Sequence, residues 1–71
     1  MLPIKFEYLQ DLYVDGRQKE KHHITILSQF KQHYTGETMY RILVQLENGF
    51  SFEDIVSEHR IKEMLNARVE G

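Results

Sequence analysis

The segment from residue 46 to residue 61 constrains the fold of this chain more than any other, because its turn and capping residues are closely spaced. Gly49 suits the position after a helix C-terminus, where the backbone turns left-handed and glycine carries no steric penalty. Ser51 can cap a following helix, and Asp54 three residues later completes a pattern similar to a capping box. The spacing therefore predicts that one helix ends just before Gly49 and that a second runs over residues 52–60.

Residues 39–46 carry the clearest helical pattern in the chain. Apolar side chains recur there at i, i+3, i+4 and i+7, namely Met39, Ile42, Leu43 and Leu46. The same segment can also be a strand with alternating apolar residues, which Asn48-Gly49, a strong hairpin dipeptide, would connect to the next strand. Leu43 breaks that alternation, so the helix is the favoured interpretation and the strand is the alternative.

The first half of the chain is ambiguous in the same way. Residues 4–15 have apolar side chains at helical spacing, with Pro3 before them and Asp15-Gly16 as a stop. They also alternate like a strand, in which case Asp15-Gly16 would be a hairpin turn. Residues 23–33 follow the helical spacing as well, although their β-branched residues keep a strand possible. We favour helices in both segments.

These patterns predict an all-α fold, a small bundle of four to five short helices in a single domain over residues 1–71. A small α+β fold with a β-hairpin is the alternative. A chain of 71 residues can enclose one modest core, and without cysteine it has no disulfide to stabilise it. Residues 38–70 contain the pattern Gly49, Ser51, Glu53, Asp54, Ile55, Val56 and Ile61, and this half of the chain resembles a helix-turn-helix.

The resemblance implies a regulatory protein that binds DNA or a DNA-associated protein. Its recognition helix would cover residues 62–70. The side chains expected to reach phosphates or base edges are basic or amide groups: Arg60, Lys62, Asn66, Arg68 and Lys21. The sequence departs from the pattern at Val56, Arg60 and Lys62, where such proteins favour alanine, glycine and a serine or threonine cap.

The charge balance and the aromatic residues favour another function. Nine basic and eleven acidic residues give a net charge of −2, whereas nucleic-acid binding calls for a basic face. Eight Tyr and Phe residues are many for so small a core. The candidates for an exposed protein interface are Phe30, Tyr34, Phe50 and Phe52. The alternative function is therefore a small protein-binding inhibitor or adaptor, with no DNA contact and no catalysis.

No catalytic constellation, metal site or cofactor site is expected. The serines lack a base and an orienting group, and the four histidines lack the spacing of metal ligands. His59 is expected to be a partly buried core residue. No apolar run is long enough to span a bilayer, no secretion signal is recognisable, and no small-molecule substrate is expected. A cytoplasmic protein is the expectation.

A homodimer is expected from the size of the core. Residues 4–14 could fold back over the stripe of His23, Ile26, Leu27, Phe30 and Tyr34, which would give a compact monomer. If residues 4–14 are too short or too polar for this, the stripe needs other cover, and this is the outcome that we favour. A second copy in a two-fold contact would supply it, with Phe30 at the centre.

Overall fold

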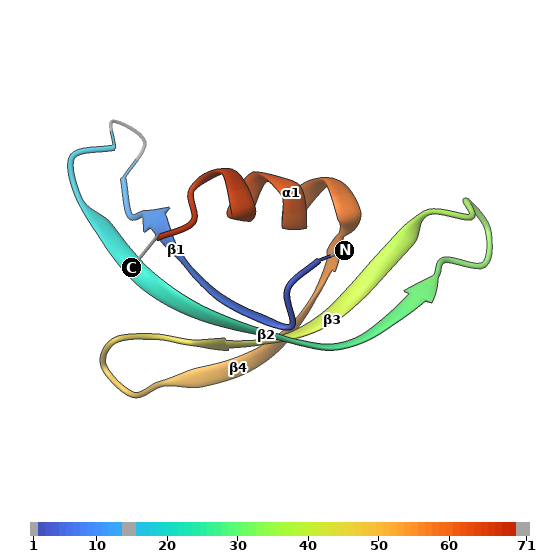
Figure 1. The fold of residues 1–71 in the computed structure, drawn as a ribbon, viewed down its shortest axis with the longest axis horizontal. Helices are drawn as coiled ribbons and strands as arrows, with labels where there is room; N and C mark the ends of the chain where they lie inside the picture. The colour runs from blue at the N-terminus through green and yellow to red at the C-terminus, as the bar shows by residue number, and fades with distance from the viewer. Residues whose placement is uncertain (1, 14–15, 70–71) are drawn as a thin grey trace.

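The computed structural model describes residues 2–13 and 16–69 and has a four-stranded antiparallel sheet with one helix (Figure 1). The strands are β1 (Lys5–Asp11), β2 (Lys19–Lys31), β3 (Thr38–Gln45) and β4 (Ser51–Ser57), and the helix is α1 (Glu58–Asn66). Each strand pairs with the next in the chain, in the order β1-β2-β3-β4. The helix lies across the concave side of the curved sheet.

The predicted all-α bundle and its helix-turn-helix are therefore wrong. The core explains why the strands form: alternate residues of β1, β2 and β3 face α1 and are buried. The buried side chains are Phe6, Tyr8, Ile24, Tyr40, Ile42 and Val44 from the sheet, and Ile61 and Met64 from the helix. The rest of the sheet's surface faces away from α1 and is called the open face below. The alternative α+β fold with a hairpin is the closer description.

β3 shows how the helical spacing misled. Ile42 pairs with Ile26 and faces the helix, whereas its neighbour Leu43 pairs with Thr25 and lies half-buried on the open face. A central strand with apolar residues on both faces meets the i, i+3, i+4 spacing by coincidence. Leu43 therefore does not break the alternation but belongs to the second face of the sheet.

The turn at Gly49 connects β3 to β4 instead of two helices. The Gly49 N–H donates to the Leu46 carbonyl at 3.1 Å, and the Leu46 N–H donates to the Phe50 carbonyl at 2.8 Å. Gly49 has a φ of 91°, so the left-handed backbone predicted from the sequence is present, but it closes a three-residue hairpin loop. The stop predicted at Asp15-Gly16 falls partly outside the described residues, which exclude Asp15.

The helix begins six residues later than predicted. Ser57, and not Ser51, is its N-cap, because the Ser57 Oγ accepts a hydrogen bond from the Arg60 N–H at 3.1 Å. Ser51 instead begins β4. The predicted recognition helix over residues 62–70 consequently starts in the middle of α1, and Glu70 lies outside the described residues.

A bulge in β2 changes which face its second half presents. The register shifts between Ile26 and Ser28, so Ser28 pairs with Arg41 and Phe30 pairs with Met39. Ile26 faces the helix, whereas Phe30 lies on the open face with Met39. Residues 27–31 extend past the end of β1 as one strand of the β2–β3 hairpin, and we call them the β2 arm (Figure 1).

Only part of the sheet's edge is covered. After α1 the chain returns along β1: the Leu9 N–H donates to the Ala67 carbonyl at 3.1 Å and the Val69 N–H to the Glu7 carbonyl at 2.9 Å. In the described part of the chain, the edges without a neighbouring strand include the outer edge of β4 and the β2 arm. Such edges offer backbone groups to another polypeptide.

Candidate functional site

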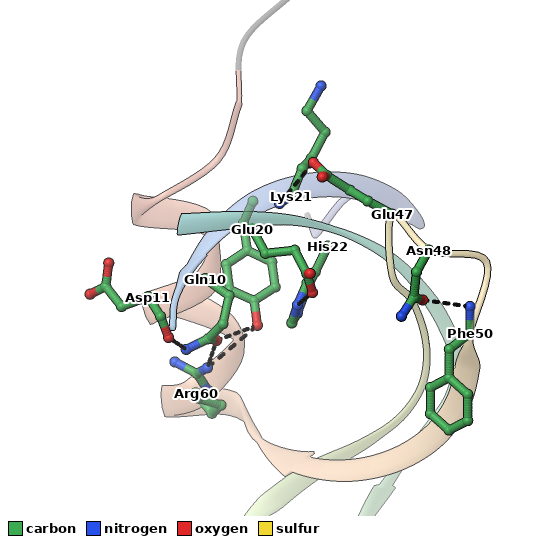
Figure 2. A network of polar contacts seen from close by, with 10 residues as sticks. Gln10, Asp11, Glu20, Lys21, His22, Glu47, Asn48, Phe50 and Arg60 are labelled. Carbon is green, nitrogen blue, oxygen red and sulfur yellow. Dashed lines mark hydrogen bonds and ion pairs between the residues drawn. The ribbon is translucent and has the colours of Figure 1, made fainter. Parts of the chain in front are cut away.

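A polar network joins the first turn of α1 to β1 (Figure 2). The Gln10 Oε1 accepts hydrogen bonds from the Tyr8 hydroxyl at 2.7 Å and from the Arg60 Nη2 at 2.9 Å. The Arg60 guanidinium also lies 5.8 Å from the centre of the Tyr8 ring. Burial raises the pKa of Tyr8 above its ordinary value, although the Arg60 charge opposes this shift. At neutral pH the Tyr8 hydroxyl is therefore a protonated donor, and the network fixes the helix to the sheet.

The neighbouring strand adds a second polar pair on the same face. The His22 Nε2 lies 2.9 Å from the Glu20 Oε1 (Figure 2). The His22 ring also meets the Tyr8 ring edge-on, with the ring centres 5.6 Å apart. Within residues 2–13 and 16–69, every buried side-chain nitrogen or oxygen has a hydrogen-bond partner. These groups satisfy one another, so the arrangement is a structural link between β1, β2 and α1.

The five residues predicted to contact DNA do not share one surface. Arg60 belongs to the polar network, Lys62 lies exposed on α1, and Asn66 ends the helix. Arg68 follows the helix, and its backbone pairs antiparallel with that of Tyr8 at the edge of β1. Lys21 lies on the open face, 3.7 Å from the Glu7 carboxylate, and the sheet separates it from α1. The helix-turn-helix that was expected to bring these residues together is absent from the residues that the structure describes. Contact of any of them with DNA stays a prediction.

A groove lies between the N-terminal segment, the β2 arm and the start of α1. Its volume is about 590 Å³, and its walls include Leu2, Ile4, Ile26, Tyr40, Glu58 and Lys62. Burial, and next the Glu58 charge, raise the pKa of Tyr40 above its ordinary value. No sequence motif indicated this groove, because its walls come from four separate segments.

The β3–β4 hairpin presents two aromatic rings side by side. The Phe50 and Phe52 side chains are 58% and 39% exposed, and their ring centres are 5.9 Å apart. Two hydrogen bonds order the loop that carries them (Figure 2). The Asn48 Oδ1 accepts from the Phe50 N–H at 2.8 Å within the loop, and the Glu47 Oε1 accepts from the Lys21 N–H of β2 at 3.2 Å. The sequence identified both rings as interface candidates.

Acidic residues follow this aromatic pair along β4. Glu53 and Asp54 are exposed on the strand, and Glu58 begins the helix that comes next. Arg41 offsets part of this charge, since its Nη1 lies 3.3 Å from the Glu53 Oε1. Phe52 and Asp54 pair with Val44 and Ile42 on the face that carries α1, whereas Glu53 pairs with Leu43 on the open face, so the outer edge of β4 is acidic on both faces.

The other two interface candidates lie on the opposite hairpin. Phe30 is 41% exposed on the β2 arm, and Tyr34 at the tip of the β2–β3 hairpin is 93% exposed. The Tyr34 ring contacts only the His33 ring among the aromatic pairs of the described residues, with centres 5.3 Å apart. The structure thus places the four predicted aromatic residues in two separate exposed groups.

The histidines are dispersed. His59 is exposed on α1, 3.7 Å from the Glu63 carboxylate, so its predicted burial in the core is wrong. His23 lies on the open face, 3.2 Å from the Glu7 carboxylate. In the described part of the chain, no three His, Asp or Glu side chains are placed to hold a metal ion.

No helix in the described part of the chain has the length and apolar character needed to cross a membrane.

Comparisons with protein-family models, with curated proteins and with solved structures give no significant match to this chain.

Proposed function

We propose that this chain is a non-catalytic protein-binding module, a small inhibitor or adaptor, that presents its β3–β4 hairpin to a basic segment of a partner protein. The observation that carries the proposal is the exposed Phe50–Phe52 pair on a hydrogen-bonded turn. Aromatic side chains are enriched at protein interfaces and dominate their binding energy. A turn that is already ordered loses little conformational entropy on binding.

The charge around the pair supports a cationic partner. Glu53, Asp54 and Glu58 follow Phe52 along one edge, and Arg41 neutralises only part of their charge. Complementary charge speeds association and rejects partners of the wrong sign. A lysine- or arginine-rich segment beside an apolar anchor fits this surface, whereas a phosphate backbone would be repelled.

The backbone of β4 supports an extended partner near the hairpin. The hydrogen bond between Leu46 and Phe50 directs the backbone groups of even-numbered β4 residues toward β3, so those of Ser51 and Glu53 point outward. A partner strand could pair with Ser51 and Glu53 and place alternate side chains beside Phe52. The Ile55 N–H, farther along, already donates to the Asp54 carboxylate.

Site-specific photo-crosslinking in the native host tests the proposal. A photoreactive phenylalanine at position 50 should capture a protein with a basic segment, and the double variant Glu53→Lys, Asp54→Lys should abolish the capture. The same probe at Tyr34, on the opposite hairpin, should not capture that protein. Capture of nucleic acid, or capture that survives the charge reversal, would contradict the proposal.

A further inference from the structure

We infer that two copies of this chain form a two-fold dimer in which their β2 arms pair edge to edge, antiparallel, about Phe30. This surface is separate from the β3–β4 hairpin, so the dimer does not depend on the proposed function. It joins two four-stranded sheets into one continuous sheet.

The backbone of the β2 arm has groups available for this pairing. The Gln32 N–H donates to the Glu37 carbonyl at 2.8 Å, and pairing continues from there through Phe30 and Met39. Because these bonds recur at every second residue, the backbone groups of Gln29 and Lys31 point away from β3. β1 does not pair with these groups, because the hydrogen bonds between β1 and β2 end where the Ile26 N–H donates to the Ile4 carbonyl at 2.8 Å.

A two-fold axis at Phe30 satisfies all these groups at once. Each copy's Gln29 then lies opposite the partner subunit's Lys31, and each such pair exchanges two backbone hydrogen bonds. Phe30 lies opposite its own copy at a position without hydrogen bonds, where facing Cα atoms are about 4.5 Å apart and side chains touch. The bulge in β2 puts Phe30 beside Met39 on the open face, so the two Phe30 rings would pack between two Met39 side chains.

One pair of opposite charges would meet across this edge, in a groove that Lys62 also lines. Gln29 pairs with Tyr40 and lines the groove that also contains Glu58. The partner subunit's Lys31, next to Gln29 on the same face, would extend over this groove toward Glu58. Neither Lys31 nor Glu58 takes part in an ion pair among residues 2–13 and 16–69, so each is available for the other.

The outer edge of β4 is unsuited to the same self-pairing. A two-fold axis at Asp54 would place two carboxylates directly opposite each other, with Glu53 and its copy nearby. The Ile55 N–H that should pair outward is already bonded to the Asp54 Oδ1 at 2.8 Å. The β2 arm carries no carboxylate and has no such internal bond in the described structure, so the second copy belongs there.

Sedimentation equilibrium of the full chain tests the dimer. The wild type should associate in the micromolar range typical of a small interface. Phe30→Asp should abolish the association, because two carboxylates would face each other at the axis. Ile55→Asp, a matched change on the open face of the outer strand β4, should leave the association intact. A wild type that stays monomeric up to hundreds of micromolar, or a dimer that survives Phe30→Asp, would overturn the inference.

Two further experiments test the dimer if Phe30→Asp fails to fold: a pair of charge-reversal variants, and hydrogen exchange of backbone amides in the wild type. Lys31→Glu should weaken the dimer at least several-fold, and adding Glu58→Lys should restore it. In the wild type, hydrogen exchange at the Gln29 and Lys31 amides should slow as the protein concentration rises, while exchange at the Glu53 amide stays constant. Concentration-dependent protection of Glu53 instead would assign self-association to β4 and overturn the inference.

Discussion

The Asp54 carboxylate accepts a hydrogen bond from the backbone N–H of the next residue, Ile55, at 2.8 Å. This N–H points away from β3, toward the side where a further strand would pair. Asp54 thereby closes the middle of the β4 edge with its own side chain and adds a negative charge there. Exposed edge strands commonly carry such features, which prevent uncontrolled pairing between sheets.

Removing this carboxylate should open the β4 edge. In Asp54→Ala, the Ile55 amide should exchange several-fold faster, and the protein should aggregate more readily in concentrated solution. Asp54→Asn keeps an oxygen acceptor and loses the charge, so it should preserve the slow exchange of Ile55. Amide exchange and light scattering on the three proteins measure both effects. Equal exchange at Ile55 in all three would show that the hydrogen bond does not protect this edge.

The cap of α1 gives a sharper stability test. Ser57→Ala removes the acceptor for the Arg60 N–H and should destabilise the fold by about 1 kcal/mol. Ser51→Ala, at the serine that the sequence suggested as a cap, should change stability by less than about 0.5 kcal/mol, because Ser51 is an exposed strand residue. Urea denaturation measures both. A larger loss at Ser51 than at Ser57 would contradict the helix boundary.

The turn and capping residues could be recognised in the sequence, but the elements that they end or begin could not. Gly49 was expected to be left-handed and is, yet a left-handed glycine ends helices and closes hairpins equally well. Similarly, both Ser51 and Ser57 precede residues that a helix could contain. Only the pairing of β4 with β3 decides between them, and that pairing involves residues distant in the chain.

The residues of the candidate surfaces could be predicted from the sequence, but their arrangement could not. Phe30, Tyr34, Phe50 and Phe52 exceed what a small core can hide, and all four are exposed. Composition could not show that they divide between two hairpins. The bulge that brings Phe30 to the open face and the groove beside Tyr40 depend on the register of β2 against β3. Register comes from long-range packing, which periodicity within one segment does not specify.

The Tyr8–Gln10–Arg60 network should behave as a coupled unit. Tyr8→Phe and Arg60→Met each remove one of the two hydrogen bonds that the Gln10 Oε1 accepts, and each should destabilise the fold by about 1 kcal/mol. Arg60 and Tyr8 also contact each other directly, since the Arg60 Nη2 lies 3.5 Å from the Tyr8 hydroxyl. Each single variant loses this contact and the double variant loses it only once, so the loss in the double variant should fall short of the sum of the single losses by at least about 0.5 kcal/mol. A double-mutant cycle from urea denaturation measures this difference, and strict additivity would contradict the coupling.

Alkaline pH should destabilise the fold through its buried tyrosines. Burial, and next Glu58, raise the pKa of Tyr40 above its ordinary value of 10.0, which the unfolded chain retains. Above pH 10.0 the unfolded chain therefore loses this proton before the folded protein does. The stabilisation from a neutral, buried Tyr40 is complete below that pH and is lost as the pH rises through the folded-state pKa.

Tyr40→Phe should remove this part of the pH dependence. Its free energy of unfolding should decline less steeply than that of the wild type as the pH rises above about 10. Tyr34→Phe, at the exposed tip of the β2–β3 hairpin, is the matched control and should follow the wild type. Urea denaturation of the three proteins at a series of alkaline pH values gives the slopes. Parallel declines for Tyr40→Phe and the wild type would show that ionisation of Tyr40 is not coupled to folding.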